Sequence, residues 1–142
     1  MISTKGRYAL RVMLDLAMDE TGTFVPLDVI ARREDISEKY LESIIVVLSR
    51  AGLVKALRGK GGGYRLSHAP EEYRVGDILR LTEKSLAPVT CLEEGIGCAR
   101  ADRCLTLPLW KGLDRVIEDY LMSFTLADLL PGGKLSLEKQ TY

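Results

Sequence analysis

Residues 1–34 carry apolar positions with the spacing of α-helices. A first helix is expected from a cap at Ser3 or Thr4 to about Asp19, before Gly22 interrupts the pattern. A second, short helix is expected from Pro26 to about Glu34, because proline is tolerated in a first helical turn. The buried stripe expected for the first helix follows the i, i+3, i+4, i+7 spacing: Leu10, Met13, Leu14 and Ala17.

Segment 35–52 has the clearest helical pattern in the chain. Ser37 is a good N-cap, Glu38 favours the positive end of the helix dipole, and Gly52 suits the left-handed position that ends a helix. Only Asp35 and Ile36 separate it from the previous helix, which predicts a helix-turn-helix, although a plain helical hairpin has the same pattern. The helix of segment 35–52, which is the later of the two, would enter the major groove of DNA. Its buried stripe is Leu41, Ile44, Ile45 and Leu48, and its opposite face is Lys39, Glu42, Ser43, Val46 and Arg50.

A basic, glycine-rich hairpin is predicted next. Leu53–Leu57 and Tyr64–Leu66 have the pattern of two short strands, joined by the turn RGKGGGY. Such a hairpin after a helix-turn-helix is the wing of a winged helix, with charge from Arg58 and Lys60. The turn lacks the GxxxxGK[ST] order of a phosphate-binding loop, so no nucleotide site is expected.

The second half of the chain predicts two more helices and a tail. Val75–Glu83 forms the first, with Val75, Ile78 and Leu79 on its apolar face. A long helix after Cys104 has a wide apolar stripe that a small domain has little surface to cover, so we expect a partner helix from a second subunit. The alternative is that it folds back on its own domain. The apolar stripe of the long helix is Leu105, Leu109, Leu113, Val116, Ile117, Tyr120 and Phe124. A capping box from Thr125 to Asp128 is expected after it, followed by a loose tail over 131–142.

Charge adds a local signal to this pattern. The net charge is zero, yet residues 1–70 carry eleven Lys and Arg against eight Asp and Glu. Five basic residues and no acidic one lie between Arg50 and Arg65, which indicates a nucleic-acid-binding patch or an ordinary solvated surface. No apolar run is long enough for a membrane span and no signal peptide is evident, so a reducing cytoplasm is expected.

The cysteines all lie in one short stretch, spaced C-x6-C-x5-C at Cys91, Cys98 and Cys104. Three thiols this close can converge on a metal centre, and their odd number does not suit a disulfide framework. Iron–sulfur clusters and zinc both favour thiolate ligands, and free structural thiols remain the simplest alternative. An enzyme is not expected, because the sequence has no CxxC, nucleophile–histidine pair or nucleotide loop.

The chain resembles the IscR, NsrR and CymR group of bacterial winged-helix transcription regulators over about residues 1–130. The resemblance lies in STKGRYAL, SEKYLE, AGLVKALRGKGGGY and the closing CLTLPLW. It implies a mainly α fold: a winged helix-turn-helix with a small β-hairpin wing over 1–86, a cysteine loop and long C-terminal dimerisation helix over 87–130, and a flexible tail over 131–142. It also implies homodimers joined through Leu109, Leu113, Val116, Ile117 and Tyr120.

The resemblance further implies which residues meet a double-stranded DNA operator. Ser37, Tyr40, Glu42 and Ser43 would approach bases or nearby phosphates, with Glu42 tuning which sequences are accepted. A carboxylate can accept a hydrogen bond from cytosine, which suits that role, although Glu42 also suits a plain solvent-facing helix position. Contacts to the DNA backbone would come from Lys5, Arg7, Lys39, Arg50, Arg58, Gly59 and Lys60.

The residues look most like the IscR type, which implies a 2Fe–2S cluster on the three cysteines and a repressor of cluster-assembly or cysteine and sulfur genes. Two departures leave the fourth ligand open: Leu107 stands where that type has histidine, and Arg7 where the NsrR type has a carboxylate. The first cysteine gap is also one residue longer than is usual. Three nearby carboxylates are candidates for the fourth ligand: Glu93, Glu94 and Asp102. Water or a small thiol is also a candidate. In the alternative, as in the CymR type, a docked cysteine-biosynthesis enzyme would switch a metal-free regulator. A switch by thiol redox state is also open, and the partner protein could belong to cysteine metabolism or to cluster assembly.

Overall fold

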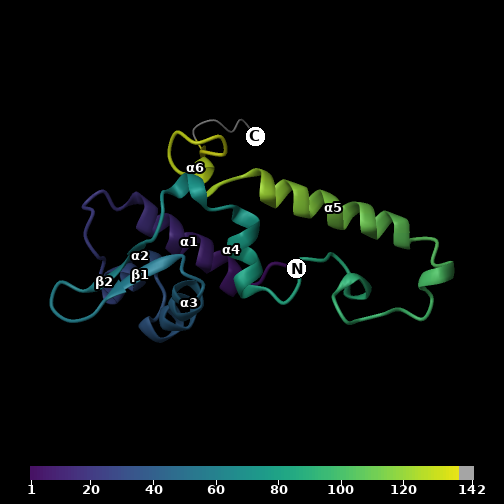
Figure 1. Ribbon diagram of the computed structural model, residues 1–142, viewed down its shortest axis with the longest axis horizontal. Helices are drawn as coiled ribbons and strands as arrows, with labels where there is room; N and C mark the ends of the chain where they lie inside the picture. The colour runs from purple at the N-terminus through teal and green to yellow at the C-terminus, as the bar shows by residue number, and fades with distance from the viewer. Residues whose placement is uncertain (138–142) are drawn as a thin grey trace.

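The protein, described over residues 1–137 by a computed structural model, is mainly helical with one two-stranded antiparallel hairpin. This confirms the predicted winged-helix architecture (Figure 1). No helix in this range is long and apolar enough to cross a membrane. The elements are α1 (Thr4–Met18), α2 (Leu27–Glu34), α3 (Glu38–Arg50), β1 (Val54–Leu57), β2 (Gly63–Leu66), η1 (Pro70–Glu72), α4 (Val75–Thr82), η2 (Thr90–Leu92), η3 (Ala101–Arg103), α5 (Leu107–Ser123) and α6 (Leu126–Leu129).

Local capping chemistry sets the helix ends where the sequence predicts them. The Ser3 hydroxyl accepts a hydrogen bond from the Gly6 amide, and the Ser37 hydroxyl accepts one from the Tyr40 amide, both at 3.1 Å. Between α2 and α3, Asp35 adopts a left-handed conformation with φ of 53°, which makes the tight turn of the helix-turn-helix. Gly52 follows α3 with φ of 76°, as expected for the residue after a helix C-cap.

The core lies where α1, α2, α3 and α4 meet. All four predicted stripe residues of α3 are buried, and so are Val75, Ile78 and Leu79 of α4. The stripe predicted for α1 is partly wrong, because only Met13 of that set is fully buried and the other three are half-buried. Apolar residues surround most of α1, so helical spacing fits two overlapping stripes. The buried one is Ala9, Val12, Met13 and Leu16.

The hairpin is held to the helices by a third extended segment. Val25 and Tyr64 exchange two backbone hydrogen bonds of 2.8 Å, so the stretch before α2 pairs with β2. A Cβ at Gly63 would collide with the carbonyl oxygen of Val25, and Gly63 has φ of 147°. Glycine at this position is therefore required by the close approach of two backbones, as well as by its torsion angle.

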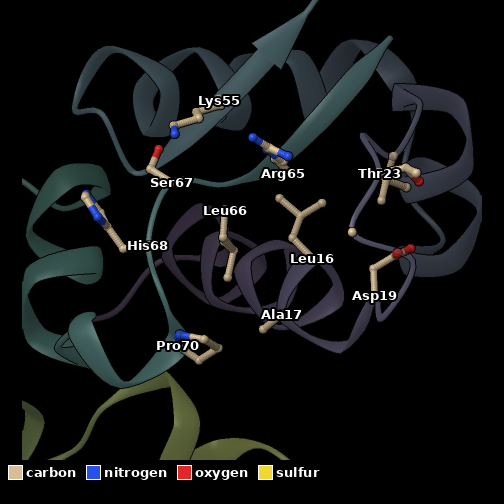
Figure 2. Close-up of a pocket in the computed structure, with 12 residues that line it drawn as sticks. Leu16, Ala17, Asp19, Thr23, Lys55, Arg65, Leu66, Ser67, His68 and Pro70 are labelled. Atoms are coloured by element: carbon tan, nitrogen blue, oxygen red, sulfur yellow. The ribbon is translucent and has the colours of Figure 1, made fainter. Parts of the chain in front are cut away.

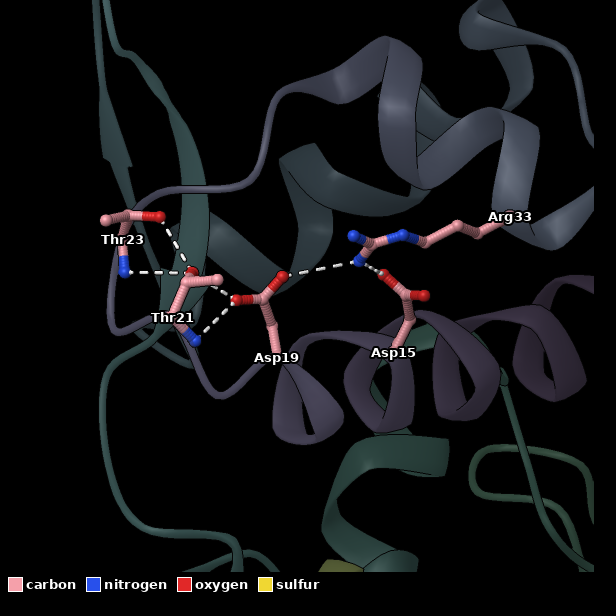
Figure 3. A network of polar contacts seen from close by, with 5 residues as sticks. All are labelled: Asp15, Asp19, Thr21, Thr23 and Arg33. Carbon is pink, nitrogen blue, oxygen red and sulfur yellow. Dashed lines mark hydrogen bonds and ion pairs between the residues drawn. The ribbon is translucent and has the colours of Figure 1, made fainter.

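A polar network locks α2 onto the end of α1 (Figure 3). One guanidinium nitrogen of Arg33 lies 3.4 Å from a carboxylate oxygen of Asp15 and 3.4 Å from one of Asp19. Thr21 donates to Asp19 from its amide, at 3.1 Å, and from its hydroxyl. Burial raises the pKa of Asp15, whereas the hydrogen bonds from Thr21 lower the pKa of Asp19.

Residues 83–125 extend away from this body as an arm (Figure 1). A loop containing the cysteines runs outward, and α5 returns along it toward α6. No residue of α5 is buried. After the predicted capping box at Thr125 and Asp128, the chain folds back, with Leu135 donating to the Asp128 carbonyl and Ser136 buried. Pro131–Leu137 thus differs from the loose tail expected for 131–142; residues 138–142 lie outside the described residues.

Candidate DNA-binding surface and cysteine loop

The outer face of α3 is polar and free to make contacts. Ser37, Lys39, Glu42, Ser43 and Arg50 are all exposed. Two of these side chains also serve the helix itself. The Ser37 hydroxyl caps α3 through its acceptor lone pair, and the Ser43 hydroxyl donates to the Tyr40 carbonyl at 2.6 Å. In this conformation, Ser37 therefore keeps its donor hydrogen for a partner, while Ser43 keeps its acceptor capacity.

Tyr40 differs from its neighbours because its ring is half-buried. It packs edge-on against Tyr8 of α1, with ring centroids 5.8 Å apart and planes at 87°. The Arg11 guanidinium lies 4.7 Å from the Tyr8 ring centroid and also pairs with Glu34 at 2.7 Å. The recognition-helix candidate is therefore braced from α1 by an aromatic pair, a contact that sequence spacing did not predict.

The wing presents its charge on an exposed turn between β1 and β2. Arg58, Gly59 and Lys60 are all exposed. Gly59 and Gly61 have φ of 89° and 74°, a left-handed conformation that favours glycine, and nothing lies within 4 Å of where their Cβ atoms would be. The tip is thus shaped by backbone torsion and is open to a second molecule.

The basic residues divide into two groups by their partners. Four arginines of the body form ion pairs: Arg11, Arg32, Arg33 and Arg80. None of the cations predicted to anchor DNA forms an ion pair with any described residue; these are Lys5, Arg7, Lys39, Arg50, Arg58 and Lys60. Arg7 does donate to the Thr4 hydroxyl at 3.2 Å. Unpaired cations on the helix-turn-helix and wing suit phosphate contacts, because no internal ion pair has to break first.

The cysteine loop has ligand chemistry without an assembled ligand set. All three thiols are free, with Cys98 exposed and Cys91 and Cys104 half-buried. Over residues 1–137, no three His, Cys, Asp or Glu side chains come together as a metal group, so the expected convergence is not formed in the single chain. A hydrogen bond shared with the Thr106 hydroxyl lowers the pKa of Cys104, which favours its thiolate. Free thiols suit an iron–sulfur cluster by donor type, although the chain supplies only three of them.

Both ends of the arm are fastened to the winged-helix body. At the start, Glu83 accepts hydrogen bonds from the Ser3 amide at 2.9 Å and the Ser3 hydroxyl at 2.7 Å. At the end, the Val75 amide donates to the Phe124 carbonyl at 3.0 Å, and the Leu126 amide to the Tyr73 carbonyl at 2.9 Å. These links join positions up to 80 residues apart, and no local sequence signal indicates them.

Between these ends, α5 presents apolar side chains to solvent. Leu109 and Val116 are each 63% exposed, Tyr120 is 57% and Leu113 is 40%, whereas Ile117 is half-buried. Tyr120 packs on Phe124 with centroids 5.0 Å apart. The helix does contact α4, through an ion pair of Arg80 with Glu118 and a bond from Arg80 to the Met122 sulfur at 3.4 Å. Folding back on its own domain therefore leaves most of the predicted stripe uncovered.

Comparisons with known proteins cover nearly the whole chain. Residues 2–132 match the family Rrf2, described as an iron-dependent transcriptional regulator. The chain is 40% identical to protein rrf2 of Nitratidesulfovibrio vulgaris over 94% of its length and 89% of the relative's. It is 39% identical to the regulator IscR of Vibrio campbellii over 94% of its length and 79% of that protein's.

Solved structures point the same way. T. potens IscR has a TM-score of 0.75 and 37% identity, and covers 100% of this chain and 93% of its own. CymR of B. subtilis, described as the global cysteine regulator, has a TM-score of 0.76 and 39% identity over 93% of this chain and 97% of its own. An oxidized form of Staphylococcus aureus CymR has a TM-score of 0.70 and 35% identity, over 89% of this chain and 92% of its own. The structural neighbours thus include two kinds of regulator on one fold.

Proposed function

The chain belongs to the Rrf2 family of transcriptional regulators, and from this premise we propose a homodimeric repressor whose operator binding is controlled by an iron–sulfur cluster. It is a regulator and not an enzyme, as its relatives' names indicate. The genes it controls would serve cluster assembly or cysteine and sulfur supply. The proposal is supported above all by one arrangement. The body carries the unpaired cations on its helix-turn-helix and wing. An arm that carries all three cysteines is hydrogen-bonded to this body at both of its ends.

Operator binding would use α3 and the wing. Ser37, Glu42 and Ser43 would face base edges from the N-cap and first half of α3, where a recognition helix reads the major groove. Tyr40 would hold that helix against Tyr8 while its hydroxyl reaches the DNA. The phosphate contacts would come from the unpaired cations Lys5, Arg7, Lys39, Arg50, Arg58 and Lys60, with the backbone at Gly59 close to the groove.

The dimer would form through the exposed stripe of α5. Leu109, Leu113, Val116 and Tyr120 lie on this helix with Ile117, at the spacing of one helical face. A second copy of α5 would cover them, as an isologous interface requires. The arm attachments would then set the separation of the two α3 helices, because the residues directly after α5, Phe124 and Leu126, are hydrogen-bonded to Val75 and Tyr73 of the body.

Cys91, Cys98 and Cys104 would hold the cluster through their thiolates. Such a cluster, which the resemblance to the IscR type implies is 2Fe–2S, supplies a redox-active and exchangeable group. The fourth ligand is open, because neither Leu107 nor Arg7 can ligate, and Glu93, Glu94 and Asp102 are the nearest carboxylates in sequence. Ordering the loop would act on the body at Glu83, whose carboxylate holds Ser3 next to Lys5 and Arg7. Only a difference in affinity between the two loop states would change DNA binding.

The cluster is tested by anaerobic purification followed by iron, acid-labile sulfide and Mössbauer analysis. Wild type should carry iron and sulfide, and Cys91→Ser, Cys98→Ser or Cys104→Ser should lose them. Ser85→Ala, near the start of the same loop, is the matched control and should retain both. A wild-type protein with neither iron nor sulfide would remove the cluster from the proposal.

The wing is tested by mobility shifts over a range of salt. Arg58→Ala and Lys60→Ala should weaken binding to all sequences about equally and reduce the salt slope by about one for each phosphate that the variant no longer neutralises. Lys111→Ala, which removes the same charge from the arm, should leave the slope unchanged. Equal slopes in all three variants would contradict the wing assignment.

We propose a metal-free regulator as the second candidate function, for two reasons. The three cysteines do not form a metal-binding group in the described part of the chain, and CymR structures are similar to this one. The regulator would then carry no metal, and a docked cysteine-metabolism protein or oxidation of the thiols would switch it. Docking predicts that the three Cys→Ser variants keep normal regulation. Thiol switching predicts that operator affinity changes with oxidant in metal-free protein, and that Cys→Ser abolishes the change.

A further inference from the structure

A concave site lies at the root of the wing, between the end of α1 and the base of the β1–β2 hairpin (Figure 2). Its volume is about 300 Å³, at the lower end of small-molecule sites. Leu16, Ala17, Leu66 and Pro70 give it an apolar floor. Its polar groups come from several segments: Asp19, Thr23, Lys55, Arg65, Ser67 and His68.

Two cations line this site, and neither has an acidic partner among the described residues. Lys55 and Arg65 are directly opposite each other in the β1–β2 register, and both are exposed. Like charges at such a position repel and weaken the hairpin. Within the described chain, neither forms an ion pair, and Arg65 is held with its guanidinium 4.6 Å from the Phe24 ring centroid. A like-charged pair in the lining of a pocket favours an anion as its occupant.

Among the described residues, the lining has one carboxylate, and that carboxylate is already engaged. Asp19 accepts from the Thr21 amide and hydroxyl and pairs with Arg33, so it is directed into the α1–α2 network (Figure 3). Ser67 and Thr23 add hydroxyl groups to the lining, and the Thr23 hydroxyl shares a hydrogen bond with that of Thr21. Figure 2 shows Lys55 and Arg65 on one side of the pocket, above the apolar side chains of Leu16 and Leu66.

The pocket is separate from the surface assigned to DNA. None of the lining residues comes from α3 or from the wing tip. The lining instead joins α1, the segment before α2, β1, β2 and the stretch leading to η1. An occupant would contact the wing and the helical body at once.

We propose that this pocket binds a compact organic carboxylate, with the anionic end on Lys55 and Arg65 and an apolar body on Leu16 and Leu66. Charge-assisted hydrogen bonds from two cations fix the carboxylate, and burial of the apolar body adds affinity. Binding neutralises the Lys55–Arg65 repulsion and links the wing root to α1. The ligand therefore shifts wing orientation and, through it, operator affinity, to the extent that it prefers one orientation.

The binding test uses benzoate as the probe and benzamide, a neutral molecule of the same shape, as the control. In thermal-shift and calorimetric titrations, benzoate should bind wild type saturably, and benzamide and equal sodium chloride should not. Lys55→Gln and Arg65→Gln should each weaken benzoate about tenfold or more, because each removes a charged hydrogen-bond donor. Lys111→Gln, the same charge change on the arm, should leave it unaltered. No saturation, or equal binding of benzamide, would overturn the site.

The repulsion is tested with Lys55→Glu, which turns the like-charged pair into an opposite-charged one. Without ligand, this variant should melt above wild type, and it should no longer respond to benzoate. A lower melting temperature would contradict the repulsion on which the site depends. Lys55→Gln and Arg65→Gln could instead bind the operator more weakly and with less dependence on salt, while binding benzoate as wild type does. This result would identify the pair as a phosphate contact and overturn the proposal. Since benzoate binding is read without DNA, its failure is distinct from failure of the proposed regulator.

Discussion

The winged-helix body and the arm have similar proportions of apolar residues but use them differently. In the body, α3 buries Leu41, Ile44, Ile45 and Leu48 completely or nearly so. In the arm, the longer α5 buries no residue at all. Both helices have a clear apolar stripe, so the stripe shows that a face needs a partner without showing which chain supplies it. The body thus covers the apolar stripe of α3 within one chain, while the arm leaves the stripe of α5 exposed.

This difference suits a regulator that must bind and respond. The body holds α3 and the wing in fixed positions through a packed core, the Val25–Tyr64 bridge and the Arg33 network. The arm carries thiols on a loop with few buried contacts, which is the kind of region that changes at low free-energy cost. Its two fastenings, at Ser3–Glu83 and at Val75–Phe124, are where such a change would reach the body.

The largest expected effect contrasts one leucine from each region. Leu48→Ala in the core, where the side chain is fully buried, should lower the free energy of unfolding by about 2–5 kcal/mol. Leu109→Ala on α5, 63% exposed in the single chain, should cost far less at protein concentrations too low for association. Urea unfolding measured at several protein concentrations makes the comparison. Equal losses for the two variants at low concentration would show that α5 is packed within one chain.

Within the body, two wing glycines separate backbone strain from collision. Gly61→Ala places a side chain in open space at φ of 74° and should cost about 1–2 kcal/mol from strain alone. Gly63→Ala adds a collision with the Val25 carbonyl and should cost more, because the Val25–Tyr64 bridge must open. Urea unfolding gives both values, and amide exchange at Tyr64 reports the bridge. A Gly63→Ala variant that keeps Tyr64 protected would disprove this account of the hairpin anchor.

For the arm, Leu113→Glu should weaken self-association at least about tenfold, or ~1.4 kcal/mol, by placing a charge in the apolar stripe. Helix content should be unchanged, because Leu113 is exposed in the single chain. Sedimentation equilibrium and circular dichroism measure the two. Lys111→Gln, an equal change of charge on the same helix, is the control and should associate as wild type does. If Leu113→Glu associates normally, the stripe is not the dimer interface.

The smallest expected effect lies in the acid stability of the α1–α2 network. The lowered pKa of Asp19 means that its ionised form stabilises the fold, and this contribution is lost as pH falls through the folded-state pKa. The raised pKa of Asp15 means that its ionisation opposes folding, so acid relieves that cost before Asp15 protonates in the unfolded chain. Unfolding of Asp19→Asn between about pH 3 and 6 should therefore depend less on acid than wild type, on the order expected for one carboxylate. The stability of Asp15→Asn should depend on acid more than that of wild type. A change in the same direction for both variants would contradict the opposite pKa shifts of Asp15 and Asp19.

Sequence reasoning was most accurate where the signal is local. Ser37, Gly52 and the Thr125–Asp128 box lie where capping chemistry predicts, because the groups that interact are within a few residues of each other. It was least accurate for α1, where apolar residues on adjoining faces fit two stripes. The cysteine spacing identified a stretch with thiolate chemistry, yet the described part of the single chain does not gather the thiols.

The sequence by itself determined the helices, the hairpin and the family, since caps, periodicity and a glycine-rich turn act over short distances. Only the tertiary structure decided which α1 stripe is buried, that Val25 pairs with β2, and that Ser3 is bound to Glu83. It also decided that Lys55 and Arg65 share a pocket while α5 stays uncovered. The physical reason is common to all of these. Each depends on which distant surfaces meet, and a pattern along the chain records the need for a partner but not its identity.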